Sequence, residues 1–393
     1  MPLHTTLYYI FFFVLFFLLV VSIQRDSYGK KIPYFAVVVL LISFNGLRYF
    51  VGRDYHVYMD GYSNSYSEAL IHMEPLWKGL RAILLHFHLH VAIWFLLTAA
   101  FIVIFVLRAY RKQSYFFPLA LLAFVLVYPL YFETFNTVRQ ACAQTVILFT
   151  FPLFRDKKYW QTLILLLIAF SLHRTATIMF FFLPLCFVRY SRILVGAILI
   201  VGVTILPYLL YAGFKMLVES HLVSNFYITT DSLLPQVASL SPAILFRLAI
   251  AFYFLYRQRE LLEKDASLLP YLNALFFATF LNLLAIRVFS IGTATRFSLY
   301  FTYTYPILLS NVYWIGKNID RWAIFVIFFF EITICVKSIY TADSREDRFY
   351  LYDTIFFDRE QPMSYPGKKK ISLLSPLKEK TSTPKRTLLC YLK

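Results

Sequence analysis

The sequence predicts an all-α, polytopic transmembrane helical bundle of about 12 spans, and three observations lead to this prediction. Of the 393 residues, 60% are hydrophobic and only 15% are charged, whereas a soluble domain carries about 25% charged residues. Long uncharged stretches recur to about residue 340. Lys and Arg gather at the ends of these stretches, where they orient helices in a membrane.

The apolar stretches approach the length of a membrane crossing, which is about 20 residues with a range near 17–25. The first stretch has no Lys or Arg before it and no small-residue cleavage site after it, so we interpret it as a retained helix and not as a signal peptide. The expected spans are 5–24, 32–47, 89–107, 113–132, 137–154, 159–173, 174–189, 193–212, 239–256, 267–286, 296–314 and 322–338.

The short loops predict the orientation of these spans. A basic group follows every odd-numbered span, so all the groups lie on one side, which the positive-inside rule makes cytoplasmic. The number of spans depends on residues 159–188. One helix of that length would be about 45 Å long, and a single crossing there would place every later basic loop outside. We therefore expect two short helices that meet on the outer side at His173-Arg174. The basic groups are Arg25, Lys30 and Lys31; Arg108, Arg111 and Lys112; Arg155, Lys157 and Lys158; Arg189 and Arg192; Arg257, Arg259 and Lys264; and Lys317 and Arg321.

The chain divides into a membrane domain, 1–340, and a C-terminal tail, 341–393. Two long outer loops are expected, 48–88 after the second span and 213–238. The tail is rich in Ser, Pro and Lys beyond about residue 360, a composition typical of disorder. An even number of spans places it outside despite its basic character, so its side stays open. The net charge of +17 does not indicate nucleic-acid binding, because it is spread over many loops.

The sequence contains no motif for a metal ion, a nucleotide or another cofactor, and we expect none. It lacks the phosphate-binding glycine loops, the HExxH zinc motif and the GxSxG nucleophile motif. Its cysteines form no CxxC pair and are Cys142, Cys186, Cys335 and Cys390.

Ionisable residues in or beside the predicted outer turns are the functional candidates, because such groups are costly near hydrocarbon. Arg139 lies on the first turns of an apolar helix, His173-Arg174 interrupts an apolar run, and Arg287 and Arg296 bracket a short turn. The planar guanidinium fork binds phosphate oxygens through paired hydrogen bonds. Several Arg on one outer face would therefore suit a diphosphate at the membrane boundary.

Purely structural roles stay open at this stage. Arg48 and Arg287 would fit long side chains that reach the interface. Arg247 would fit an intramembrane ion pair with Glu331, and Glu74-Pro75 would fit the start of an amphipathic helix. His173 would also fit an interfacial histidine, and the tyrosines of the outer loop would fit an aromatic belt.

The same residues resemble a known family. The succession Gly46-Leu-Arg48-Tyr-Phe-Val-Gly52-Arg53-Asp54-Tyr55-His-Val-Tyr58 resembles the Gly-x-Asp-Tyr-x-x-Tyr stretch after the second helix of the EpsG family, which belongs with the Wzy-type polysaccharide polymerases. Arg53 departs from the small neutral residue that the family usually has before the Asp. The resemblance covers about 1–358. Further matches follow in the family's order and are Glu74-Pro75, Asn136-x-x-Arg139-Gln140, His173, Arg296-Phe297 and the LYDTIFF segment near Tyr352.

The resemblance implies a polysaccharide polymerase for exopolysaccharide, capsule or O-antigen in the bacterial inner membrane. Such an enzyme moves a growing glycan from undecaprenyl diphosphate onto a lipid-linked repeat unit on the outer face, without a metal ion or a nucleotide sugar. Its implied partners are the undecaprenyl-diphosphate-linked oligosaccharide, the bilayer, a flippase and a chain-length regulator. The acceptor hydroxyl needs a base, for which Asp54, Glu74 and His173 are the catalytic candidates. The substrate-binding candidates are Arg48, Arg53, Tyr55, Tyr58, Asn136, Arg139, Gln140, Arg174, Arg287 and Arg296.

Two other function classes remain as alternatives. A membrane O-acyltransferase that modifies a surface glycan takes its acyl donor from the cytoplasm, so its key residues should lie nearer the inner face. A lipid-glycan flippase or transporter usually has internal repeats and charged or broken helices at mid-membrane. Only Arg247 and Glu331 favour that class.

Overall fold

The computed structural model describes residues 3–24, 31–49, 51–52, 54–64, 70, 73–128, 130–210, 212, 242–287, 293–341, 352 and 354. Within these residues the structure is helical and has no β-strand, which confirms the all-α prediction. An isolated bridge pairs Arg48 with Thr354. Arg53 and the expected outer loop 213–238 lie outside the described residues, as does nearly all of the tail.

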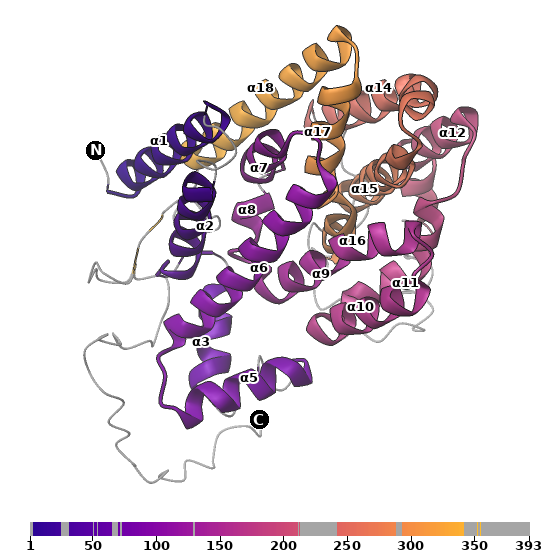
Figure 1. Cartoon of the computed structure of the whole chain (residues 1–393). Helices are drawn as coiled ribbons and strands as arrows, with labels where there is room; N and C mark the ends of the chain where they lie inside the picture. The colour runs from indigo at the N-terminus through magenta and orange to yellow at the C-terminus, as the bar shows by residue number, and fades with distance from the viewer. Residues whose placement is uncertain are drawn as a thin grey trace.

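The order of the helices follows the apolar stretches of the sequence (Figure 1). The first part of the chain contains α1 (Leu3–Gln24), α2 (Lys31–Gly46), α3 (Tyr55–Ser63), α5 (Pro75–His86), α6 (Val91–Gln113), α7 (Phe117–Leu126), α8 (Leu130–Glu133) and α9 (Val138–Arg155). The second part contains α10 (Tyr159–Leu172), η1 (Arg174–Thr177), α11 (Ile178–Cys186), α12 (Arg192–Val203), α14 (Pro242–Lys264), η4 (Ala266–Leu268), α15 (Leu269–Arg287), α16 (Thr293–Thr302), α17 (Tyr305–Ile315) and α18 (Asn318–Thr341).

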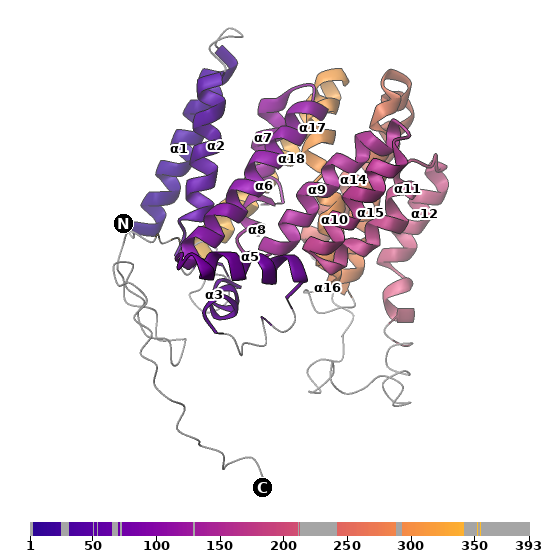
Figure 2. The ribbon, with the colours of Figure 1, turned by 60° about the horizontal axis from the view of Figure 1, so that its bottom comes forward.

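The long helices lie side by side and connect two ends of the molecule (Figure 2). The last turns of α1, α6 and α14 lie at the same end, at the top of that view, and we call it the basic end because basic groups of the sequence follow these helices. The short helices α3 and α5 lie at the opposite end, which we call the site end. The described part of the expected outer loop, which contains α3 and α5, thus lies away from the last turns of α6 and α14.

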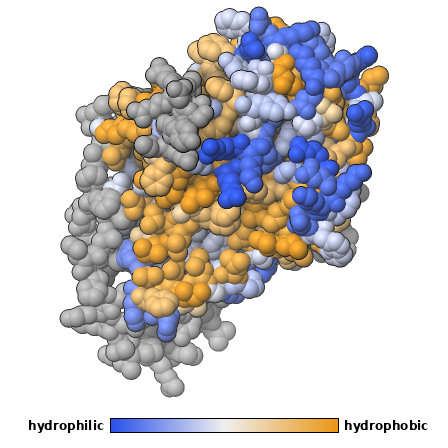
Figure 3. Space-filling view, in the orientation of Figure 1, coloured by the Kyte–Doolittle hydropathy of each residue, from blue (hydrophilic) through white to orange (hydrophobic). Residues whose placement is uncertain are grey.

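Two helices, Val91–Gln113 and Ala266–Leu284, are long and apolar enough to cross a membrane by length and composition. Others are apolar but shorter, among them Pro33–Gly46 and Tyr159–Leu172. The total of about 12 crossings therefore stays a prediction. Large apolar side chains also face outward, including Trp160 and Phe181. Figure 3 shows a broad apolar zone, with hydrophilic residues gathered where α12, α14 and α17 lie.

The expected spans 113–132 and 296–314 are each broken in the structure, the second between α16 and α17. The stretch 113–132 divides into α7 and α8 around Tyr128, whose φ of 54° no helix residue adopts. The Tyr128 backbone N–H, freed from the helix, donates to Glu331 Oε2 at 3.2 Å, as a backbone donor in an apolar environment requires. Arg247 lies over the Tyr128 ring, 4.7 Å from its centre. Arg247 and Glu331 thus meet at Tyr128, and the described residues show no direct ion pair between them.

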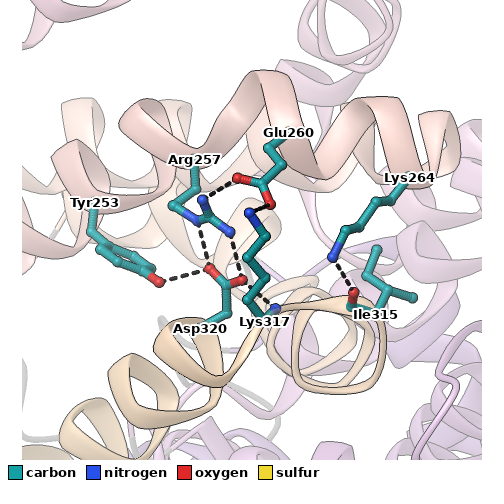
Figure 4. Close-up of polar contacts among 7 residues, drawn as sticks. All are labelled: Tyr253, Arg257, Glu260, Lys264, Ile315, Lys317 and Asp320. Atoms are coloured by element: carbon teal, nitrogen blue, oxygen red, sulfur yellow. Dashed lines mark hydrogen bonds and ion pairs between the residues drawn. The ribbon is translucent and has the colours of Figure 1, made fainter.

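At the basic end, a buried ion pair joins α14 to the start of α18 (Figure 4). Arg257 donates from Nε and Nη2 to the two carboxylate oxygens of Asp320, at 2.8 and 2.9 Å. Tyr253 donates its hydroxyl to Oδ1 at 2.7 Å, and the Lys317 backbone N–H donates to Oδ2 at 2.7 Å. Asp320 is fully buried, and its bond to Lys317 satisfies one of the free N–H groups that begin α18. A side chain at Gly316 would approach the Val312 carbonyl to 2.4 Å, so this turn requires glycine.

We expect Asp320→Ala to destabilise the protein by about 3–5 kcal/mol, because the largely buried Arg257 would lose its bidentate partner and keep only the partly exposed Glu260. Thermal melting of the purified protein in detergent measures this effect. Glu263→Gln is the matched control. It removes the exposed ion pair between Glu263 and Arg259, which should be worth under about 1 kcal/mol. Equal melting of the two variants would show that the buried pair does not hold α14 to α18.

Candidate functional site

Glu74, Arg139 and His173 meet at the site end, and we call them the Glu74 triad. Arg139 Nη1 donates to Glu74 Oε2 in a short charged hydrogen bond. Glu74 Oε1 lies 3.0 Å from His173 Nδ1. The three side chains come from the residue before α5, the first turn of α9 and the residue after α10. The fold therefore brings together three residues that the sequence selected separately.

Local backbone geometry places Glu74 and His173. Pro75 is the first residue of α5, and Glu74 precedes it with an extended backbone at φ −63° and ψ 149°, as a residue before proline prefers. Trp77 Nε1 donates to the Leu172 carbonyl at 2.7 Å and fixes the first turn of α5 against the last turn of α10. His173 then follows in an extended conformation, φ −158°, which confirms the predicted helix break there.

The entry to α9 places Arg139, the second residue of that helix. Three groups from the segment after α2 contact this entry. Arg48 Nη2 donates to the Phe135 carbonyl at 3.1 Å, and the Tyr58 hydroxyl donates to the Asn136 carbonyl at 3.3 Å. Gly52 lies against the same two residues with φ of +100°, a conformation that L residues rarely adopt.

Burial and charge act in opposite directions on Glu74. Burial alone would raise the pKa of the Glu74 carboxyl, but the hydrogen bond with His173 and the charge of Arg139 outweigh it and lower the pKa to about 2. The group is therefore charged at neutral pH. Its contribution to stability is present above the ordinary pKa of 4.5 and is lost only as the pH falls toward about 2.

Polar atoms of this region remain available to a ligand. His173 Nε2, Arg139 Nε and Gln140 Oε1 are buried, and none has a hydrogen-bond partner among the described residues. Buried polar atoms are usually paired, so atoms without a protein partner at a cluster of charges mark a place where a ligand can bind. When Glu74 accepts from Nδ1–H of a neutral His173, the lone pair of Nε2 can accept a proton. The arrangement can thus orient a base beside a cation.

The other predicted residues divide into those near the triad and those held elsewhere. Gln140 is buried and donates its amide to the Arg296 carbonyl, which brings the start of α16 beside α9. The side chains of Arg174 and Arg296 are exposed. Asp54 precedes α3, is half-buried and makes no side-chain hydrogen bond among the described residues. Arg53 and the side chain of Arg287 lie outside the described part of the chain.

Arg48 was expected to bind substrate, and the structure places its guanidinium against backbone carbonyls. Arg48 is only 1% exposed, and its guanidinium donates to the carbonyls of Asn45, Val51 and Phe135. It also lies 4.6 Å from the centre of the Phe95 ring. Its donors are directed at backbone carbonyls inside the protein, so in this structure Arg48 holds together the segments of the site end.

Tyr55 and Tyr58 were expected to bind substrate, and the structure buries both of them. Tyr55 is 2% exposed and stacks on Phe95 with ring centres 4.5 Å apart. Tyr58 is 7% exposed, and the Arg139 guanidinium lies 5.9 Å from the centre of its ring. Asn136 is half-buried and contributes its carbonyl to Tyr58. Tyr58 therefore packs against Arg139, while Tyr55 packs on α6.

Two supporting residues were missed by the sequence analysis. Trp77 fixes α5 to α10, as described above, and Tyr300 on α16 places its hydroxyl 3.0 Å from Thr175 Oγ1 in η1, just after His173. Trp77 follows Glu74-Pro75 closely in the sequence and could have been suspected from that position. Tyr300 carries no such signal, because its partner is 125 residues away.

We expect Gly52→Ala to destabilise the protein by about 1–3 kcal/mol, since an L residue is strained at positive φ. The new methyl group would also approach the Phe135 carbonyl to 2.8 Å and push the entry of α9 away. Thermal melting and the activity assay below measure both effects. Gly79→Ala in α5 is the control, because nothing lies within 4 Å of its Cβ position and Ala favours a helix by about 0.5–1 kcal/mol. A Gly52→Ala protein that melts like Gly79→Ala would contradict this reading of Gly52.

Comparison with known proteins adds a family to this geometry. No curated protein and no solved structure matches the chain. The EpsG family matches residues 31–354. The matched region begins at the first residue of α2 and ends at Thr354, which pairs with Arg48 beneath the site. It includes every residue of the Glu74 triad and covers most of the chain, so this protein belongs to the EpsG family.

Proposed function

We propose that this protein is a polysaccharide polymerase that moves a growing glycan from undecaprenyl diphosphate onto a lipid-linked repeat unit at the outer face of the bacterial inner membrane. Membership of the EpsG family supports a polymerase-like role in polysaccharide biosynthesis. The observation that carries the proposal is the Glu74 triad, which places a carboxylate-oriented histidine beside an arginine. Transfer from a lipid diphosphate needs both a base and a cation.

In the proposed reaction, His173 Nε2 accepts the proton of the acceptor hydroxyl while that oxygen attacks the anomeric carbon of the growing chain. The new glycosidic bond forms as the bond between that carbon and the diphosphate oxygen breaks. The departing diphosphate carries the electron pair and is stabilised by Arg139, with the exposed Arg174 and Arg296 as further cations. Glu74 holds His173 and Arg139 in place, so it acts as a positioning residue. The reaction balances without a metal ion or a nucleotide sugar.

The proposed topology has about 12 crossings with the triad outside. Contacts between distant segments support an even number of crossings. Tyr352, which follows α18, donates its hydroxyl to the Phe44 carbonyl at 2.7 Å and stacks on the Phe44 ring at 3.9 Å. Its ring also lies 5.9 Å from that of Tyr8 near the start of α1. The segment after α18 therefore returns to the end of the molecule where the chain begins.

Cysteine labelling of intact cells tests the orientation. We expect Ser63→Cys, at the end of α3, to react with a membrane-impermeant maleimide, and Asp156→Cys, in the turn after α9, to react only after the cells are opened. Both residues are exposed. Replacing Cys390 by Ser removes the native cysteine outside the described residues, and the other cysteines are buried. Labelling of Asp156→Cys in intact cells would show that the protein has the opposite orientation to the one proposed.

A deletion strain and the purified protein test the function. The strain should still export single lipid-linked repeat units and should lose long polymer. The purified protein should convert such units into polymer without a nucleotide sugar and in the presence of a chelator. Loss of an ester group at unchanged polymer length would instead identify an acyltransferase. Units trapped on the cytoplasmic face would identify a flippase.

A further inference from the structure

A cavity of about 1020 Å³ lies at the basic end of the molecule, away from the Glu74 triad. We call it the α6–α9 groove. Its walls come mainly from the last turns of α6 and α9, with residues of α10 and the start of α15. Nothing in the proposed polymerase reaction uses these residues.

The deeper part of the groove is apolar and aromatic. Phe101, Phe105 and Phe149 form a continuous wall, with ring centres 4.8 Å apart for Phe101–Phe105 and 6.2 Å apart for Phe105–Phe149. Leu165 and Ile168 of α10 continue it. Phe105 is 40% exposed, so the wall is not sealed by neighbouring helices.

The upper part of the groove is cationic. Arg108 and Lys112, one turn apart on α6, and Arg155 at the end of α9 line it, and no acidic residue does. Among the described residues Arg108 and Lys112 form no ion pair, and Arg155 has only the exposed Asp156 at 3.4 Å. The hydroxyl of Ser114, which also lines the groove, is buried without a hydrogen-bond partner in the described structure. These groups suit the oxygens of an anion.

The length of the groove matches one leaflet of a bilayer. Eleven residues of α6 separate Phe101 from Lys112, a rise of about 16 Å at ~1.5 Å per residue. Half the hydrocarbon thickness of a bilayer is about 15 Å. A groove with cations at one end and an apolar wall of one leaflet's depth fits an anionic lipid, whose head group binds the cations while its chain lies along the wall.

We propose that the α6–α9 groove binds one anionic phospholipid of the leaflet next to the basic loops. Its phosphate lies against Arg108, Lys112 and Arg155, and an acyl chain lies along the wall formed by Phe101, Phe105 and Phe149. The site is separate from the proposed catalytic reaction and stands whether or not that reaction is the right one.

Native mass spectrometry of the full-length protein in neutral detergent, titrated with phosphatidylglycerol, tests the proposal. The test variant is the triple change Arg108→Gln, Lys112→Gln and Arg155→Gln. Each cation contributes about a five-fold gain in affinity, so we expect a loss of about 100-fold. The matched control is Arg189→Gln, Arg192→Gln and Arg259→Gln, which lowers the charge equally at the smaller groove that these residues line, also at the basic end. The affinity of this control variant for phosphatidylglycerol should stay within about two-fold of that of the unchanged protein. The single variant Lys112→Gln, with about a five-fold loss, replaces the triple if that protein does not fold.

Further arms identify the ligand. Phosphatidylcholine should bind at least ten-fold more weakly than phosphatidylglycerol, and Phe105→Ser should weaken phosphatidylglycerol about ten-fold, because the chain loses an aromatic contact. The proposal is overturned by equal losses in the two triple variants, by equal binding of the two lipids, or by unchanged binding to Phe105→Ser. Complete displacement by millimolar inorganic phosphate would indicate a soluble-anion site instead. Preferential displacement by undecaprenyl phosphate would indicate a site for the carrier lipid.

Discussion

We expect His173→Gln to lower the rate of polymer formation by about 10²–10⁴-fold, the range for removal of a general base. Gln keeps a polar group that can bond to Glu74 Oε1, now 3.0 Å from His173 Nδ1, but it cannot accept a proton at neutral pH. Glu74→Gln should lower the rate comparably, because His173 loses the carboxylate that fixes its tautomer and Arg139 loses its partner. The assay is polymer formation by purified protein from lipid-linked units, with melting measured on the same samples.

Asp54→Asn distinguishes the triad from the remaining candidate base. Asp54 makes no side-chain hydrogen bond among the described residues, so we expect this variant to retain its rate within a few-fold. A loss of the size seen for His173→Gln would transfer the role of base to Asp54. The pH profile is a second criterion. Because the pKa of Glu74 is about 2, a fall in activity between pH 7 and pH 5 cannot come from protonation of that carboxylate.

Arg139→Lys and Arg139→Ala should both lose polymer formation, by about 10²–10³-fold, as when one stabilising donor is removed from a transition state. An ammonium keeps the charge, but it cannot reach Glu74 through one nitrogen while offering others to a diphosphate, as the planar guanidinium can. Arg139→Ala should also melt lower than Arg139→Lys, because it leaves the buried Glu74 carboxylate without its cation. The lysine variant therefore separates the loss of the fork from the loss of charge.

Arg189→Lys is the control for the arginine series, because Arg189 is exposed and follows α11. It should retain the full rate. A rate for Arg139→Lys close to that of Arg189→Lys, at equal protein levels, would show that the paired fork is not used. A normal rate for Arg139→Ala would remove Arg139 from the site altogether.

The sequence by itself determined the helical fold and much of the candidate site. Apolar stretches and the basic residues between them predict helices whose basic turns lie together, because hydrophobic length and charge are local properties of the chain. The prediction of a break at His173 rested on the same charges, and the structure has it. Arg139 and His173 were selected because a charge or an imidazole is costly beside hydrocarbon, and Glu74 was selected through the family resemblance. That reasoning needs no knowledge of their partners.

Only the tertiary structure decided which of these residues lie together. Arg48 and Arg139 are both arginines beside apolar stretches of the sequence. In the structure Arg48 is buried against backbone carbonyls, while Arg139 reaches Glu74. Tyr55 looked exposed in an outer loop, but it packs on Phe95 from α6. The pairing of Glu74 with His173 depends on Trp77 joining α5 to α10, a contact across 95 residues. Such contacts depend on how helices distant in the sequence pack, and hydrophobic patterns within one helix do not encode which side chains of another helix they will meet.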